Sequence, residues 1–362
     1  MSNQKILSIT IPTWNRAHIL SEQLSILTEQ ILKDNLSHKI EIVVSDNGSE
    51  DSTCEIVNNF IAKFNFIIYH KNNINYGAKY NLLKALELAN GKFCIFLGDD
   101  DRYKPNGMRK MINCIENNRF ANAIFDSHLF KKNTYSNEPF ITLEDLLTHF
   151  YYYIGNAGLF IIRTHLIQSK IKKYGYDYFS NSWPQTQLII LSLNSSDKKQ
   201  ILLKSLDLFS ESIHTKLMMY NSYYLLRGLY FDLADAIDDI KNEIPITCYQ
   251  SAKLYLKNQI IQNTFNILQC GVFVDSKMQR QTTISYINLH KYKYSFKEQF
   301  FLNLIIFVLT LPNWLSKFLS EIFIFVTRGS KGIAKKNAFV KLENEKILYN
   351  KNKDISIRTF NF

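Results

Sequence analysis

The chain is poor in the residues that organise small disulfide-bonded or zinc-containing proteins. Its five cysteines are scattered through 362 residues, and none has CxxC spacing. An odd, unpatterned set argues against a disulfide framework and a zinc site, and it predicts reduced thiols in the cytoplasm. Glycine and proline are few, at 12 and 6, while hydrophobic residues make up 46%. This composition excludes a disordered chain and predicts a globular protein with a sizeable core.

Several familiar motifs are also missing. No Walker loop or GxGxxG follows the first expected strand, which argues against a P-loop protein or an ordinary dinucleotide binder. The start, "MSNQKILSITIP", is polar and then strand-like, so we expect no signal peptide. The apolar stretch from Phe300 to Leu311 is shorter than the roughly 20 residues that span a bilayer, and Pro312 interrupts it.

Acidic residues are outnumbered, 32 against 43 Lys and Arg, which gives a net charge of +11. An excess of positive charge suits nucleic acid, anionic lipid or nucleotide phosphates as partners. No RRM, OB or helix-turn-helix signature is present, and the densest charge cluster is acidic. We therefore expect no nucleic acid partner, although a nucleic-acid-binding protein is one alternative to weigh.

The first hundred residues alternate between strand and helix patterns. "ILSITIP" has period two, and "IEIVVSD" is a continuous apolar run typical of a strand buried on both faces. "FNFIIYH" and "KFCIFLG" are further strand candidates, and helical stripes lie between the four segments. The order β-α-β-α-β-α-β predicts an α/β fold with a mostly parallel sheet covered on both faces.

Polar residues follow each of the four expected strands: "PTWNR", "SDNGSEDS", "HKNNINYG" and "GDDDRY". Ligands of open α/β sheets bind outside the carboxyl ends of the strands, so these clusters should meet at one edge. Three adjacent aspartates, Asp99 to Asp101, repel one another unless a cation neutralises them. Carboxylates are preferred ligands of Mg²⁺ and Mn²⁺, so we expect a divalent metal site there. A solvated acidic turn is the alternative.

Four blocks together resemble family 2 glycosyltransferases, which are inverting, metal-dependent enzymes of the GT-A fold. They are "SITIPTWNRAHILSEQLSIL", "EIVVSDNGSEDST", "NINYGAKYN" and "ANGKFCIFLGDDDRYKP", in the family's order and spacing. The resemblance is close over about residues 5–110 and looser to about 215. It is greatest to members of bacterial surface polysaccharide and lipooligosaccharide synthesis.

The resemblance implies a nucleotide-sugar pocket at the ends of the four expected strands. Asp46 would accept a hydrogen bond from the base, which suits the imide N–H of uracil or thymine and hence a UDP- or dTDP-sugar. Lys79 would reach the diphosphate. The implied nucleotide-sugar-binding residues are Thr13, Asn15, Arg16, Asp46, Asn47, Asn75, Gly77, Lys79 and Asp99.

The aspartate block departs from the family's DxDD pattern. Pro105 fixes the register, and Gly98 then stands where the first Asp would be. By resemblance, Asp100 is the expected ligand of Mn²⁺ or Mg²⁺, with Asp99 or Asp101 assisting and Asp101 also a catalytic candidate. The metal would bridge the phosphates and stabilise the charge of the leaving nucleoside diphosphate.

The general base is harder to place, because the acidic "ED" pair usual in the family is missing. Asp177 is the nearest carboxylate in "KKYGYDYFSNSWPQTQLIILSL", and an ordinary loop Asp is the alternative. His214 in "ESIHTK" is another candidate site residue, expected as a metal ligand, because a His near this point contacts the diphosphate or the metal in some relatives. A structural His is the alternative there.

The acceptor side should lie in the second half of the expected catalytic domain. "YIGNAGLFIIRTHL", residues 153–166, is interpreted as a loop, a strand and a turn, with Asn156 and Gly158 as pocket residues. Gln185 lies near the position of the missing acidic pair, at the start of an acceptor-side helix. Trp183 would stack on a sugar face, or else belong to the core.

The expected domains are a GT-A catalytic domain at 1–215, with nucleotide-binding (1–110) and acceptor (111–215) halves, a helical extension at 216–290 and a C-terminal region at 291–362. Trp314 to Val326 is amphipathic, and Arg328, Lys331, Lys335 and Lys336 follow it. Broken apolar helices trailed by basic residues favour attachment to the anionic cytoplasmic face of the inner membrane. The alternative is a helical hairpin packed on the protein, including a homodimer through these helices.

The expected function is transfer of a sugar from a nucleotide-diphosphate donor to a glycan or lipid-linked acceptor, with inversion. The alternative is a catalytically inactive, membrane-associated interaction protein with a glycosyltransferase-like fold, suggested by the missing "ED" pair. The three intact aspartates argue against that alternative.

Overall fold

The computed structural model describes residues 4–128, 139–180, 182–194, 200–210, 226, 230–269, 277–312 and 314–319. The chain divides into two compact units. The first contains residues 1–215 and 236–252, and the second contains residues 216–235 and 253–362. Each unit is considered by itself.

The first unit is built on an eight-stranded sheet in the order β3-β2-β1-β4-β8-β6-β9-β7. A separate two-stranded sheet pairs β5 with β10. The strands are β1 (Leu7–Thr13), β2 (Ile40–Asp46), β3 (Ile67–Lys71), β4 (Phe93–Phe96), β5 (Arg102–Tyr103), β6 (Ala123–Asp126), β7 (Phe140–Ile141), β8 (Phe160–Arg163), β9 (Ile201–Lys204) and β10 (Phe209–Ser210). The helices are α1 (Ala17–Lys33), α2 (Thr53–Ile61), α3 (Ala78–Glu87), α4 (Gly107–Asn117), α5 (Leu143–Ile154), η1 (Ala157–Leu159), α6 (Thr164–Tyr174) and α7 (Pro184–Leu193).

The expected β-α-β-α-β-α-β order of the first hundred residues is confirmed. All seven residues of β2 are buried, as its continuous apolar run predicts for a strand covered on both faces. Helix α1 buries Leu20, Leu24, Leu27 and Ile31, which recur at helical spacing and join the main apolar cluster. Local patterning and tertiary burial therefore agree in this part of the chain.

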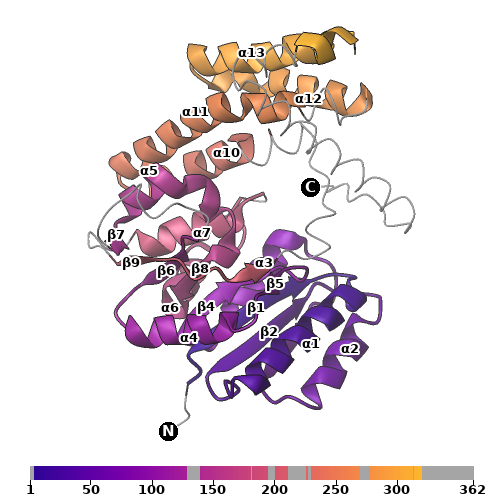
Figure 1. Cartoon of the computed structure of the whole chain (residues 1–362), viewed down its shortest axis with the longest axis vertical. Helices are drawn as coiled ribbons and strands as arrows, with labels where there is room; N and C mark the ends of the chain where they lie inside the picture. The colour runs from indigo at the N-terminus through magenta and orange to yellow at the C-terminus, as the bar shows by residue number, and fades with distance from the viewer. Residues whose placement is uncertain are drawn as a thin grey trace. The chain divides into compact units, whose positions relative to one another are not determined.

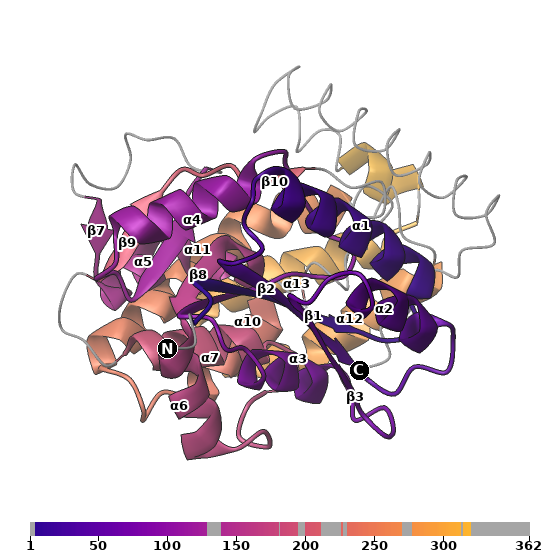
Figure 2. The same ribbon diagram turned by 90° about the horizontal axis from the view of Figure 1, so that it is seen from below.

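Helices cover both faces of the sheet (Figures 1 and 2). The two views agree that α1, α2 and α4 lie on one face and α3, α6 and α7 on the other. The main apolar cluster fills the first of these layers and joins the inward stripe of α1 to Met108 and Ile112 of α4. This two-layer burial holds the strands rigidly, so that the loops leaving them start from fixed points.

The sheet is mostly parallel, as expected, but it is mixed, because β8 and β7 run against the other strands. The pairings of β1 with β2 and β4, and of β2 with β3, are parallel. Strand β8, however, runs antiparallel to both β4 and β6, with Ile95 opposite Ile161. Because β8 runs in the opposite direction to β4, the segment that precedes β8 lies at the carboxyl end of β4. The expected turn at residues 164–166 is instead the first turn of α6.

Helices make up the described part of the second unit. They are α12 (Lys277–His290), η4 (Lys291–Lys293) and α13 (Phe296–Thr310), followed by helical residues 314–319, while α10 (Asp232–Asp239) and α11 (Ile246–Gln269) cross the boundary between the units. Tyr230 donates a hydrogen bond to Glu298 at 2.6 Å, which fixes the first turn of α13. No described helix has the length and apolar character needed to cross a membrane.

Candidate active site

The loop after β1 is tied to the loop after β2. Asn15 adopts a left-handed conformation with φ 49°, its N–H donates to Ser49 Oγ at 2.8 Å, and its Oδ1 accepts from the N–H of Glu50 at 2.9 Å. Asp51 Oδ2 accepts from the N–H of Ala17 at 3.0 Å, so it satisfies an otherwise open donor at the start of α1. The two predicted nucleotide loops thus form one hydrogen-bonded assembly.

Asp46, the predicted base-binding residue, is fully buried. Its Oδ1 accepts from the N–H of Ser49 at 2.8 Å, and its Oδ2 accepts from the Tyr69 hydroxyl at 2.7 Å. Burial, and then the bond to Asp46, raise the pKa of the Tyr69 phenol well above its usual value, so the phenol stays a donor. The described contacts of Asp46 organise its own loop, and its contact with a base stays a prediction.

Asn47, Asn75 and Gly77 are brought together. Asn47 Nδ2 donates to Asn75 Oδ1 at 2.7 Å and to the carbonyl of Gly77 at 3.1 Å. Asn47 Oδ1 accepts from the N–H of Tyr76 at 3.0 Å. The segment after β3 is therefore fastened to the end of β2, at the sheet edge that the strand order predicted.

The sequence reasoning missed Asn81, which joins β1 to β2 from helix α3. Its Nδ2 donates to the carbonyls of Thr13 at 3.1 Å and Ser45 at 2.9 Å, and its Oδ1 accepts from Ser45 Oγ at 2.7 Å. Asn81 is buried beside Leu82 on the inward face of α3. A polar residue on an otherwise apolar helical face is the signal that could have identified it.

Two of the three aspartates converge on Arg16. Arg16 Nη2 lies 3.0 Å from Asp100 Oδ2, and Nη1 pairs with Asp99. Thr13 Oγ1 donates to the second oxygen of Asp99 at 2.9 Å. All four side chains are buried or partly buried, so the pairing is less screened than at an open surface. From the sequence, we expect a metal to neutralise the repulsion between the aspartates. In the structure, the Arg16 guanidinium offsets the repulsion between Asp99 and Asp100.

Asp101 turns toward Gly98 instead. Its Oδ2 accepts from the N–H of Gly98 at 3.2 Å. Burial, and then the charge of Asp100, raise the pKa of Asp101 to about 6. A Cβ at Gly98 would lie 2.9 Å from Asp101 Oδ2 and 3.2 Å from Asp100 Oδ1. The glycine that replaces the first residue of the family's pattern therefore leaves room for the two carboxylates.

Gln23 and Arg102 hold the backbone of the aspartate turn, and the sequence reasoning missed both. Gln23 Nε2 donates to the carbonyls of Gly98 at 2.6 Å and Asp101 at 3.0 Å. Arg102 Nη1 donates to the carbonyls of Asp99 at 3.2 Å and Asp101 at 2.9 Å, and Nη2 donates to that of Ile19 at 3.2 Å. Both side chains are buried, so they fix the turn to helix α1.

The carboxylates suit a divalent cation in part. Asp99 and Asp100 share one cationic group, so their oxygens already face a common space, and hard oxygen donors are what Mg²⁺ and Mn²⁺ prefer. Among the described residues, no group of three or more His, Cys, Asp or Glu side chains could hold a metal. Two protein carboxylates completed by phosphate and water oxygens are nevertheless a common arrangement for Mg²⁺. His214 lies outside the described residues.

Lys79 and Asp177 belong to a contact between α3 and the segment after α6. Lys79 Nζ donates to the carbonyl of Phe179 at 3.1 Å, and the rings of Tyr80 and Tyr176 lie 4.7 Å apart. Asp177 is exposed in this segment. The predicted role of Lys79 at the diphosphate and of Asp177 as the base both stay predictions.

Three of the predicted acceptor-side residues, Asn156, Trp183 and Gln185, gather around Gly155. A Cβ at Gly155 would lie 2.6 Å from the Trp183 ring, and Gln185 Nε2 donates to the Gly155 carbonyl at 3.1 Å. Asn156 follows directly and is exposed. A Cβ at Gly158 would lie 3.3 Å from the carbonyl of Phe96, the last residue of β4. The segment before β8 thus lies beside the strand that leads into the aspartates.

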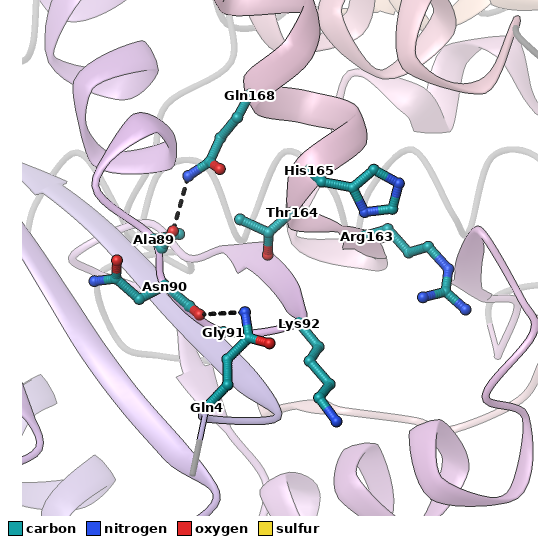
Figure 3. A pocket seen from close by; sticks show the side chains of 9 residues that line it. All are labelled: Gln4, Ala89, Asn90, Gly91, Lys92, Arg163, Thr164, His165 and Gln168. Carbon is teal, nitrogen blue, oxygen red and sulfur yellow. Dashed lines mark hydrogen bonds between the residues drawn. The ribbon is translucent and has the colours of Figure 1, made fainter. Parts of the chain in front are cut away.

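A cavity of about 390 Å³ lies elsewhere in the first unit (Figure 3). Its lining comes from the residues between α3 and β4 and from the start of α6, including Asn90, Lys92 and His165. Gln4 and Gln168 donate to the carbonyls of Asn90 and Ala89 there. These residues lie at the beginning of β4, whereas the aspartates follow its end, so the cavity is separate from the candidate active site.

Residues 8–173 match the model of Glycosyl transferase family 2. The abequosyltransferase RfbV of Salmonella typhimurium is 39% identical over 97 residues, which are 26% of this chain and 28% of the relative. The GalNAc(5)-diNAcBac-PP-undecaprenol beta-1,3-glucosyltransferase of Campylobacter jejuni is 36% identical over 96 residues, 26% of this chain and 29% of the relative. The chain therefore spans under a third of the length of these two curated relatives.

Solved structures resemble this chain in fold over a larger share of its length than the curated relatives do in sequence. TarS of S. aureus has a TM-score of 0.53 at 19% identity, covering 77% of this chain and 47% of TarS. TarS 1–349 in complex with UDP has a TM-score of 0.53 at 15% identity, covering 83% of this chain and 90% of that one. At these identities the likeness shows the fold alone. The family match places a family 2 glycosyltransferase domain at residues 8–173, and the solved structures agree with its fold.

Proposed function

We propose that the chain transfers a sugar from a nucleoside-diphosphate donor to a glycan or lipid-linked acceptor, with inversion at the anomeric carbon. The observation that carries the proposal is the meeting of Thr13, Arg16, Asp99 and Asp100 at the carboxyl edge of the sheet. A guanidinium and two carboxylates in one partly buried place can bind a diphosphate and the cation that accompanies it. The reported complex of TarS with UDP agrees with a nucleotide-sugar donor.

The hydrogen-bonded loops after β1 and β2 would bind the nucleoside. Ser49 joins them, since its hydroxyl accepts from Asn15 and its N–H donates to Asp46. Rigid loops lower the ordering cost of binding, because their conformation is set before the ligand arrives. A donor with uracil or thymine remains our proposal, since an imide N–H would suit the Asp46 carboxylate.

Asp99 and Asp100 would hold Mn²⁺ or Mg²⁺, which when bound stabilises the negative charge of the leaving diphosphate as a Lewis acid. The chain's own groups fix this arrangement. Gln23 and Arg102 hold the backbone of the turn, so that the two carboxylates face Arg16. Arg16 can orient the phosphates through a bidentate contact.

The acceptor would bind near the segment at 155–158, where Asn156 is exposed and Trp183 packs on Gly155. A base must take the proton of the attacking hydroxyl, and it must lie within hydrogen-bond reach of that group. Asp177 and Asp101 are the described candidates. A raised pKa of about 6 would let Asp101 take a proton near neutral pH, although its bond to Gly98 would have to open first.

Surface polysaccharide synthesis at the cytoplasmic face of the inner membrane is the proposed setting. It is supported by the name of the Campylobacter jejuni relative, whose printed substrate is attached to PP-undecaprenol. The second candidate, a catalytically inactive interaction protein, is favoured by one observation: Arg16 pairs with both carboxylates that would hold the metal.

The test is a calorimetric titration of UDP, dTDP, CDP and GDP, each with and without Mn²⁺, against the wild type and Asp100→Ala. We expect Mn²⁺-dependent binding of one nucleotide, lost in Asp100→Ala and kept in Glu55→Ala, which removes an exposed carboxylate of α2. Slow hydrolysis of the matching nucleotide sugar would then show transferase chemistry. Binding without any hydrolysis or transfer would support the interaction protein instead.

A further inference from the structure

Helix α13 of the second unit is apolar on two opposite sides. Leu302, Ile305 and Leu309 are buried on one side. Phe296, Phe300 and Phe307 are exposed by 88%, 60% and 56%, and at 100° per residue they lie within about 40° of one another on the other side. We call these three residues the aromatic stripe. A helix of a soluble protein normally presents polar residues on that side.

The helical turn after α13 has the same character. Trp314 and Phe318 are four residues apart, so they share a helical face, and they are exposed by 71% and 56%. This turn, residues 314–319, follows Pro312 and the extended Leu311 that ends α13. Exposed aromatic residues at this density mark a surface that is covered by a partner.

The charges along this part of the chain are mostly positive, although Lys293 pairs with Asp235 of α10 and Arg280 is buried. Between residues 277 and 319 the sequence has six basic residues and one acidic residue, Glu298. Glu298 is buried and accepts hydrogen bonds from Tyr230 and from the N–H of Ser295. Lys297 and Lys317 are exposed beside the aromatic residues. The covering partner must therefore present negative charge as well as an apolar interior.

A second copy of the chain fits poorly. A two-fold contact through this surface would bring together two copies of the same basic surface, including Lys297 and Lys317, and like charges oppose such a contact. An anionic bilayer meets both requirements, since aromatic rings insert at the level of the headgroups while lysines bind their phosphates. We propose that the aromatic stripe, with Trp314 and Phe318, docks on an anionic lipid surface. This proposal stands on the second unit alone and does not depend on the proposed activity.

The test is sedimentation of the full chain with vesicles of phosphatidylcholine, alone or mixed with phosphatidylglycerol. We expect binding to the mixed vesicles only, weakened at least about tenfold in the double variant Phe296→Gln/Phe300→Gln. Lys297→Gln/Lys317→Gln should bind less and lose part of its salt dependence. The matched control is Phe120→Gln, which removes a phenylalanine exposed by 70% in the first unit.

Tryptophan quenching and the oligomeric state of the chain in solution test the proposal further. Brominated phosphatidylglycerol should quench tryptophan fluorescence in the wild type and much less in Trp314→Phe, whatever the double variant does. A wild type that ignores mixed vesicles, or a double variant that binds like the wild type, would overturn the proposal. So would a wild-type dimer that becomes monomeric in the double variant, because the stripe would then be an interface between copies.

Discussion

Arg16 Nη2 lies 3.0 Å from Asp100 Oδ2, so the residue predicted to hold a metal is paired with a cation of the chain itself. The second nitrogen of the same guanidinium pairs with Asp99. A divalent cation that binds Asp100 must therefore displace this contact or share the carboxylate with it. Nucleotide phosphates offer the guanidinium an alternative partner, which favours entry of the metal together with the nucleotide.

Replacing Arg16 by Gln should strengthen the binding of Mn²⁺ in the absence of nucleotide by about tenfold, because two adjacent carboxylates lose their competing cation. Titration followed by the electron paramagnetic resonance of free Mn²⁺ measures this directly. The control is Arg109→Gln. Arg109 lies on α4, away from the aspartate turn, and its guanidinium pairs with Asp34 at 2.6 Å. Unchanged or weaker binding of Mn²⁺ in Arg16→Gln would show that Arg16 does not compete for the site.

Replacing Arg102 by Leu should lower the free energy of unfolding by about 2–4 kcal/mol, because it leaves buried carbonyls of the aspartate turn without donors. The Arg102→Leu variant should also lose Mn²⁺-dependent nucleotide binding, because the aspartate turn is no longer held in place. Urea denaturation and the calorimetric titration measure the two effects. Arg119→Leu is the control, since Arg119 is exposed and donates to a helical carbonyl at 3.2 Å. An Arg102→Leu variant that keeps full stability would contradict the assigned role.

Gly48→Ala should be more destabilising than Gly175→Ala. Both glycines have positive φ, 73° and 74°, so alanine is strained at both by roughly 1–3 kcal/mol, and Gly175, with ψ 169°, lies in a region almost confined to glycine. A Cβ at Gly48, however, would lie 2.6 Å from the carbonyl carbon of Ile74, whereas one at Gly175 meets nothing within 4 Å. Thermal denaturation of the two variants compares the two losses of stability. Equal losses would mean that the loops at Gly48 and Ile74 move apart easily.

Asp51 should stabilise the fold only above acidic pH. Burial opposes its ionisation, but hydrogen bonds from Thr53 Oγ1 and from the N–H groups of Ala17 and Thr53 lower its pKa below the usual value. Because the folded pKa is depressed, the stabilisation is present above about pH 4 and is lost as the pH falls through the folded pKa. Asp51→Asn should cost about 1 kcal/mol at pH 7, as for other helix caps, and less near pH 3.

Urea denaturation between pH 3 and pH 7 measures this difference. Glu29→Gln is the control, because Glu29 is an exposed carboxylate of α1 and its replacement should give a small, pH-independent difference. A cost of Asp51→Asn that is the same at both ends of the range would indicate that the charge of Asp51 contributes nothing.

The sequence determined the first four strands, the helices between them and the sheet edge at which their polar ends meet. Those features depend on residues adjacent in the chain, such as the seven buried residues of β2, because periodicity and burial are local properties. The acidic turn at Asp99 to Asp101 and the glycine at its start could be recognised for the same reason.

Only the tertiary structure decided how the charges of that turn are balanced. Arg16 lies 83 and 84 residues before its two partners, and Gln23 holds the turn from 75 and 78 residues away. Pairings at such separations depend on how α1 packs against the end of β4, which no local pattern contains. The same holds for β8: its antiparallel direction follows from the path of the preceding chain, and it brings Gly158 to the end of β4. Local sequence set the elements, and long-range packing set which side chains face one another.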